Sequence, residues 1–230
     1  MPWMCTHDRA GIDVGANAGV YTWHMRRFCA EVHAFEPIPE LANALRNSLP
    51  GCVIHGYALS DQPGSATLQI PIFHGQQIGA LASLTYGFDK AESVRSIEVQ
   101  LRRLDDEGIR NIGFMKIDAE GHERKVLEGA QKVLAEQKPT LQIEIEDRTS
   151  PGGIAATVAI LDELGYDAWY FHRGCLLPFS TFDAAILQNP AMISDDGWTV
   201  GTYTNNFLFF PRVPSWPGQR RAIEKFAPQS

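Results

Sequence analysis

The chain has 230 residues, of which 44% are hydrophobic and 20% are charged, and its formal net charge is −7. These values are typical of a globular protein that buries a sizeable core, and the length predicts a single domain over residues 1–230. An acidic chain gains no counterion-release energy from phosphate backbones, so nucleic acid is not expected as a partner. No segment approaches the ~20 apolar residues of a membrane-spanning helix, so a membrane is not expected as a partner either. The four cysteines form no C-x-x-C pair and there is no apolar leader, which favours a cytoplasmic protein with reduced thiols.

The first part of the chain alternates short apolar runs with helical patterns. Ala10–Val14 is apolar apart from Asp13, leads into glycines, and predicts a first strand. The elements predicted next are a helix over 19–28, a strand over 31–37, a helix over 40–49 and a strand over 52–60. This alternation is typical of an α/β protein with a parallel, doubly wound sheet.

The middle of the chain has a different pattern. "GSATLQIPIF" (64–73) and "RSIEVQLRRL" (95–104) alternate between apolar and polar residues and predict two strands of a hairpin. The loop between them, over 73–94, is rich in glycine, serine and polar residues. Loops of this length in compact domains are usually either functional lids or disordered, so one of these two states is expected for it.

The alternation resumes in the second half. Strands are predicted over 112–118, 140–146, 166–172 and 205–211, and helices over 122–137 and 153–165. The domain core therefore spans about 10–211. Residues 1–9 are a short leading segment, and residues 212–230 are expected to form a flexible tail.

The stretch "GIDVGANAGVYTW" places a glycine turn between the first strand and the first helix. Glycines there let the backbone approach a ligand closely. A dinucleotide fold would prefer G-x-G-x-x-G, and the middle glycine is missing from Gly15–Gly19. S-adenosylmethionine fits this arrangement because it has no phosphate and carries an ammonium and a sulfonium. The cofactor-binding residues predicted here are Asp13, Gly15, Ala16, Asn17, Gly19 and Thr22.

Glu36 closes the second strand, where related nucleotide-binding folds place the acid that binds ribose hydroxyls. A carboxylate accepts two such hydrogen bonds well. Pro37 follows it, and the end of the third strand is expected to flank the adenine. The further residues predicted to bind the cofactor are therefore Glu36, Pro37, Ala58, Leu59 and, at the end of the fourth strand, Asp118.

Five segments in order, "IDVGANAGVYT", "VHAFEPIPE", "GYALSDQPGSATL", "KIDAEGHERKVLEGA" and "LQIEIE", resemble the FkbM-type family of S-adenosylmethionine-dependent methyltransferases. The resemblance implies the class I methyltransferase fold, a Rossmann-like doubly wound sheet of seven strands whose last strand, over 205–211, runs antiparallel. It also implies O-methylation of a hydroxyl on a sugar, polyketide or other natural product. Only about ten residues precede the first strand, whereas family members often carry more. The cover of the site is therefore expected from residues 73–94 or from a second subunit.

Methyl transfer to a hydroxyl needs alignment of the acceptor and removal of its proton. His122 is the first candidate for the base because the pKa of a free imidazole, ~6.5, suits proton removal near neutrality. Glu120 is the second, and Asp118 lies beside both. A metal ion is not expected to be required. If Mg²⁺ binds, the residues that would hold it are Asp118, Glu144 and Glu146.

Two other functions stay open at this point. An NAD(P)-dependent oxidoreductase could use a similar fold, and a cofactor-binding module could have lost its activity. The acceptor is expected to be a small molecule, and a homodimer is compatible with the sequence.

Overall fold

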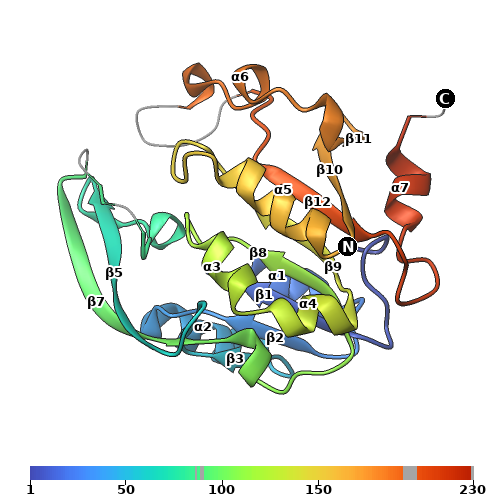
Figure 1. Ribbon diagram of the computed structural model, residues 1–230. Helices are drawn as coiled ribbons and strands as arrows, with labels where there is room; N and C mark the ends of the chain where they lie inside the picture. The colour runs from blue at the N-terminus through green and yellow to red at the C-terminus, as the bar shows by residue number, and fades with distance from the viewer. Residues whose placement is uncertain (86, 89–90, 194–200, 229–230) are drawn as a thin grey trace.

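The computed structural model describes residues 1–85, 87–88, 91–193 and 201–228. Within these residues, eight strands form one sheet (Figure 1). In order across the sheet they are β3 (Val53–His55), β2 (Val32–Phe35), β1 (Ala10–Val14), β8 (Ile112–Ile117), β9 (Thr140–Glu144), β12 (Asn206–Pro211), β10 (Tyr166–His172) and β11 (Cys175–Pro178).

The five strands from β3 to β9 pair in parallel, as the alternating pattern predicts. Strand β12 runs antiparallel to both of its neighbours, β9 and β10, which confirms the prediction for the last strand. The predicted number of seven strands is corrected to eight. The extra strand is β11, which pairs with β10 through a tight turn at Arg173 and Gly174. Both turn residues have positive φ, the conformation that two-residue hairpin turns require.

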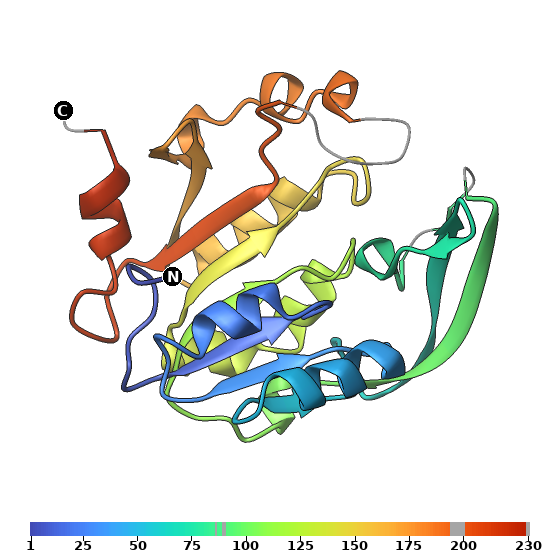
Figure 2. The ribbon, with the colours of Figure 1, turned by 180° about the vertical axis from the view of Figure 1, so that it is seen from behind.

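The strand predicted over 52–60 is two strands in two sheets. Its first part is β3 in the main sheet, and its second part is β4 (Ala58–Leu59), which pairs with β7 in a second sheet. That sheet contains the predicted hairpin, with β5 (Gly64–Phe73) antiparallel to β7 (Ser93–Arg102), and a short β6 (Gln76–Gln77). The hairpin stands away from the main sheet in both views (Figures 1 and 2).

Helices cover both faces of the main sheet (Figures 1 and 2). The helices α1 (Val20–Met25) and α2 (Pro39–Ser48) lie on one face; α3 (Glu123–Glu128), α4 (Gln131–Gln137) and α5 (Gly153–Glu163) lie on the other. The single helix predicted over 122–137 is broken between α3 and α4. At Gly129 a Cβ atom would lie 2.0 Å from the carbonyl oxygen of Ser60, so this close approach admits only glycine.

The remaining elements are short. They are α6 (Ala184–Leu187), α7 (Arg221–Phe226) and the 3-10 turns η1 (Gly79–Leu81), η2 (Leu104–Asp106), η3 (Phe179–Thr181) and η4 (Pro190–Met192). Helix α7 lies in the segment after Pro211 that the sequence predicts to be flexible. Its Ala222 is buried in a cluster with Leu176 and Phe210. Of the helices in the described ranges, none is both long and apolar enough to cross a bilayer.

The two faces of the central strands differ in character. Ile12, Ile117 and Ile143 point to the α3–α5 face and join the largest apolar cluster. On the α1 face the same strands carry Asp13, Lys116, Gln142 and Glu144. Alternate residues of a strand point to opposite faces. The polar groups of three neighbouring strands therefore gather on one side, under α1.

Candidate active site

A cavity of about 620 Å³, counting its open mouth, lies at the carboxyl ends of β1, β2 and β8, beneath the hairpin. Open α/β sheets bind their ligands at this edge. The residues that line it are Val14, Gly15, Asn17, Phe35, Glu36, Pro37, Ile38, Ala58, Leu59, Leu68, Gly79, Ala80, Ala82, Leu84, Asp118, Ala119, Glu120 and His122.

Gly15 forms the floor of the cavity where the chain leaves β1. Its φ is +73°, and a Cβ atom there would lie 1.8 Å from the carbonyl oxygen of Asp118. Any other residue would collide with the loop after β8, so the first glycine of the turn is fixed by this close approach. Gly19, at φ +80°, would place its Cβ 2.4 Å from the Leu45 side chain, and it packs α1 against α2.

Glu36 is 3% exposed and lies on the cavity wall. The backbone N–H groups of Asn17 and Ile38 donate to its two carboxylate oxygens at 2.7 and 2.8 Å. Burial raises the pKa of Glu36 to about 7, and these two amides act against that rise. Each carboxylate oxygen keeps a further acceptor position. The arrangement suits two neighbouring hydroxyl donors, as on a ribose.

Four residues predicted to bind the cofactor do not line this cavity. Asp13 is fully buried and accepts a hydrogen bond from the Thr22 hydroxyl at 2.5 Å. Ala16 packs among Ala34 and Leu45, and Gly19 packs beside it. Asp13, Ala16, Gly19 and Thr22 therefore hold the turn and α1 in place around the cavity. The other predicted cofactor residues, Gly15, Asn17, Glu36, Pro37, Ala58, Leu59 and Asp118, all line it.

The three catalytic candidates, Asp118, Glu120 and His122, lie together on the cavity wall in the loop between β8 and α3. Glu123, which is 5% exposed, shapes this loop by accepting hydrogen bonds from the backbone N–H groups of Ala119 and Gly121 at 3.0 Å each. Burial raises the pKa of Glu123 to about 7. The sequence analysis assigns no role to Glu123. Its position in "AEGHE", directly after the predicted catalytic residues, is the signal for a part in shaping this loop.

His122 lies at the hairpin side of the loop. Its Nε2 is 3.0 Å from the Ser60 hydroxyl, and its Nδ1 is 3.4 Å from the Thr85 hydroxyl. Burial, together with the charge of Lys125, lowers the pKa of His122 to about 4. The imidazole is therefore neutral at pH 7, and it is a weaker base than the free side chain from which the prediction was made.

The residues considered for Mg²⁺ each have a protein partner. The ammonium of Lys116 lies 2.7 Å from Asp118, the Asn205 side-chain amide donates to Glu144 at 2.6 Å, and Arg148 pairs with Glu146. Within the described ranges, no three His, Cys, Asp or Glu side chains form a group that could hold a metal ion.

The buried ammonium of Lys116 is matched by carboxylates. Burial works against its charge, but Asp118 and Asp13 raise its pKa above the ordinary value. Glu144, on the neighbouring strand, has a pKa raised to about 7 by burial and by the charge of Asp118. This cluster extends the candidate site from the cavity toward β9.

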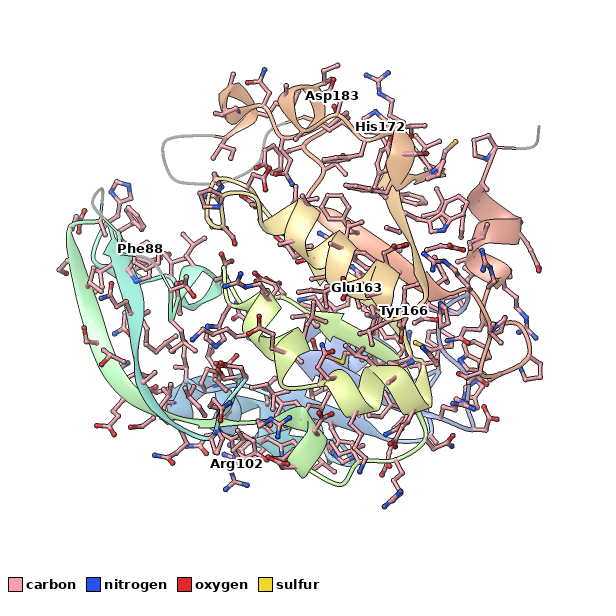
Figure 3. All side chains as sticks on the ribbon, viewed as in Figure 1. Phe88, Arg102, Glu163, Tyr166, His172 and Asp183 are labelled. Carbon is pink, nitrogen blue, oxygen red and sulfur yellow. The ribbon has the colours of Figure 1, made fainter. Side chains whose placement is uncertain are left out.

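The hairpin supplies the roof of the cavity. Leu68, Gly79, Ala82 and Leu84 line it from above, and the Ser83 hydroxyl donates to the carbonyl oxygen of Glu120 at 2.7 Å. The long loop over 73–94, predicted to be either a lid or disordered, thus contributes cavity residues, which no local sequence signal identifies one by one. Figure 3 labels Phe88 near the free end of the hairpin and Arg102 at its base.

The parallel strands lie in the order β3-β2-β1-β8-β9, with an antiparallel β12 beyond them. Together with a glycine turn after the first strand and an acid after the second, both on the cavity wall, they define a Rossmann-like α/β fold that binds a nucleotide-type ligand at this edge. The model of the methyltransferase FkbM domain matches residues 13–168 of this chain. The chain belongs to the FkbM methyltransferase family.

Among similar proteins, the 31-O-demethyl-FK506 methyltransferase FkbM of Streptomyces tacrolimicus is 30% identical over 188 residues, covering 67% of this chain and 71% of that protein. Methyltransferase sdnD of Sordaria araneosa is 25% identical over 191 residues, covering 68% of this chain and 73% of that one. The crystal structure of the methyltransferase FkbM from Methylobacillus flagellatus KT matches with a TM-score of 0.56 at 17% identity. That match covers 89% of this chain and 44% of the solved chain, and it shows a shared fold.

Proposed function

We propose that this protein is an S-adenosylmethionine-dependent methyltransferase that acts on a hydroxyl of a small molecule. The observation that carries the proposal is Glu36, a buried carboxylate on the cavity wall whose oxygens keep acceptor positions for ribose hydroxyls. Gly15 has no side chain, so its backbone lies directly at the wall of the same cavity. The run Gly15–Gly19 lacks the middle glycine that lets a backbone approach a pyrophosphate.

The cavity residues fit this cofactor. Ala58, Leu59 and Leu84 offer apolar surface for an adenine. The Glu36 carboxylate suits the ribose hydroxyls. The Asp118 carboxylate, beside Gly15, suits a positively charged ammonium or sulfonium. When bound, S-adenosylmethionine supplies a methyl group on a cationic sulfur. The protein's part is to align the acceptor, exclude water and receive the hydroxyl proton.

An oxygen acceptor is supported by the name of the Streptomyces tacrolimicus relative, which describes an O-demethyl compound on which that protein acts as a methyltransferase. The proton acceptor is proposed among Asp118, Glu120 and His122, which share one cavity wall. Asp118 is already held by Lys116, and His122 has a lowered pKa. Conservative variants, Asp118→Asn, Glu120→Gln and His122→Gln, would separate the three by their single-turnover rates.

The first test is a calorimetric titration with S-adenosylhomocysteine, and with NAD and NADP in parallel, each with and without Mg²⁺. Binding of S-adenosylhomocysteine alone, unchanged by Mg²⁺, is the expected result. Binding of NAD or NADP in its place would overturn the proposal in favour of an oxidoreductase. Methyl transfer to a panel of alcohols then distinguishes an enzyme from a module that only binds the cofactor.

A further inference from the structure

A second cavity, of about 840 Å³ counting its mouth, lies on the α1 face of the sheet at the β11 end. The hairpin that roofs the first cavity lies at the opposite end of the molecule from α7 (Figure 2), and α7 contributes two lining residues to the second cavity. The residues that line the second cavity are Met1, Trp3, Met4, Tyr21, Gln142, Phe171, Leu176, Asn206, Leu208, Ala222 and Phe226.

Most of this wall is apolar and comes from segments far apart in the chain. Phe226 of α7 meets Trp3 and Phe171 edge to face, with ring centroids 6.3 and 5.7 Å apart. Leu208 and Ala222 close the sides, at 8% and 3% exposed. Small-molecule sites are typically cavities of a few hundred Å³ whose walls are mostly apolar. A small number of polar groups on those walls point toward the ligand.

The polar groups of the cavity gather at one end. The Gln142 side-chain amide donates to the Tyr21 hydroxyl oxygen and to the Asn206 side-chain oxygen, both at 2.8 Å. Gln142 is only 8% exposed, and among the described residues its own amide oxygen accepts no hydrogen bond. An unused acceptor on a cavity wall is a position that the hydrogen-bond donor of a bound ligand would satisfy.

Tyr21 completes the pattern. Its oxygen accepts from Gln142, and its O–H hydrogen has no acceptor among the described residues. The polar end therefore offers one acceptor, on Gln142, and one donor, on Tyr21. An alcohol satisfies both because a hydroxyl donates and accepts at once, whereas an ether or a ketone can only accept.

We propose that this cavity binds a small apolar alcohol. The site is separate from the cofactor cavity, and Lys116 stands between the two. Its ammonium lies 4.6 Å from the centre of the Tyr21 ring and 2.7 Å from Asp118, which lines the first cavity. Nothing in this assignment depends on which cofactor occupies the first cavity.

The test is a calorimetric titration with 1-octanol and with 1-methoxyheptane, an ether of equal chain length that cannot donate. The wild-type protein is expected to bind the alcohol at least about tenfold more tightly than the ether. Gln142→Leu should remove most of that preference, because the acceptor for the hydroxyl proton is gone.

Filling the cavity gives an independent readout. Ala222→Phe and Leu208→Phe add volume from α7 and from the sheet, and each should weaken octanol binding by about tenfold or more. Ala155→Phe, at an exposed position of α5, is the matched control and should bind octanol as the wild type does. A cooperative thermal transition for each variant separates loss of the site from loss of the fold.

Two results would overturn the proposal. One is equal affinity of the wild type for the alcohol and the ether. The other is unchanged octanol binding in both folded cavity-filling variants. A parallel titration of each protein with S-adenosylhomocysteine tests the first cavity by itself, so the two assignments fail separately.

Discussion

In the proposed function, Glu36 is the side chain that would bind the ribose of the cofactor. Its two oxygens already accept the N–H groups of Asn17 and Ile38, which fixes the orientation of the carboxylate toward the cavity. Hydrogen bonds to a charged group contribute about 1.5–3 kcal/mol. We therefore expect Glu36→Ala to weaken S-adenosylhomocysteine binding by about 10- to 100-fold in a calorimetric titration. Glu163→Ala, at an exposed position of α5, should leave the affinity unchanged. Equal affinity of the two variants would show that Glu36 does not contribute to the binding.

Gly15 is a second residue on which the site depends. In Gly15→Ala the new methyl group would meet the Asp118 carbonyl oxygen at 1.8 Å, so β1 and the loop after β8 must separate. We expect a loss of about 3 kcal/mol or more in the free energy of unfolding, measured with guanidinium chloride. Gly51→Ala is the matched control. Gly51 also has a positive φ, +90°, but has open space around it, so only backbone strain of about 1–2 kcal/mol applies. Equal losses in the two variants would show that the contact with Asp118 is unimportant.

His122 makes the stability depend on pH in a defined direction. Its pKa is lowered from 6.5 to about 4, so between those pH values the unfolded chain binds more protons than the folded one. The contribution of His122 is therefore present above pH 6.5 and is lost as the pH falls toward 4. Its upper limit is about 3 kcal/mol.

The measurement is the free energy of unfolding of the wild type and of His122→Gln at several pH values. The difference between the two proteins should change with pH below 6.5 and stay constant above it. Glu36 and Glu123, with pKa values raised to about 7, have the opposite effect because their contribution is lost as the pH rises toward 7. They are present in both proteins, so they cancel in the comparison. A difference that is independent of pH would contradict the lowered pKa of His122.

At the scale of elements, the hairpin and the loop between β8 and α3 act as one unit. The Ser83 hydroxyl donates to the Glu120 carbonyl oxygen and accepts from the backbone N–H of Thr85, so one side chain joins roof and wall. Ser83→Ala should weaken this connection by about 1 kcal/mol. We expect faster hydrogen exchange at the hairpin amides and several-fold weaker binding of S-adenosylhomocysteine. Ser65→Ala, on the exposed part of β5, should change neither. Equal exchange in both variants would mean that the Ser83 hydrogen bonds do not hold the hairpin.

At the scale of the whole molecule, the sequence predicts the position of residues that directly follow a recognisable strand. Asp118, Glu120 and His122 follow one strand, so they necessarily reach one edge of the sheet, and Glu36 reaches it from the next strand but one. Asp13 was predicted in the cavity but points under α1. A strand that is buried on both faces gives no sequence signal for which face meets the ligand.

Features that depend on distant segments could not be predicted. The strand over 52–60 divides between two sheets because Ala58 and Leu59 pair with β7, more than forty residues later in the chain. The second cavity needs the first residues, α1, β9 and α7 together, and no local pattern indicates that these segments meet. Contacts of this kind follow from tertiary packing rather than from local pattern.

The hydrogen bond from Ser83 to Glu120 also bears on catalytic turnover. If this roof must lift before a ligand leaves, each reaction cycle includes one opening of the hairpin. Where such an opening is slower than the chemical step, the first turnover is fast and later ones wait for product release. The kinetic trace would then begin with a burst whose amplitude equals the concentration of enzyme. The steady-state rate would equal the rate of hairpin opening rather than the rate of methyl transfer.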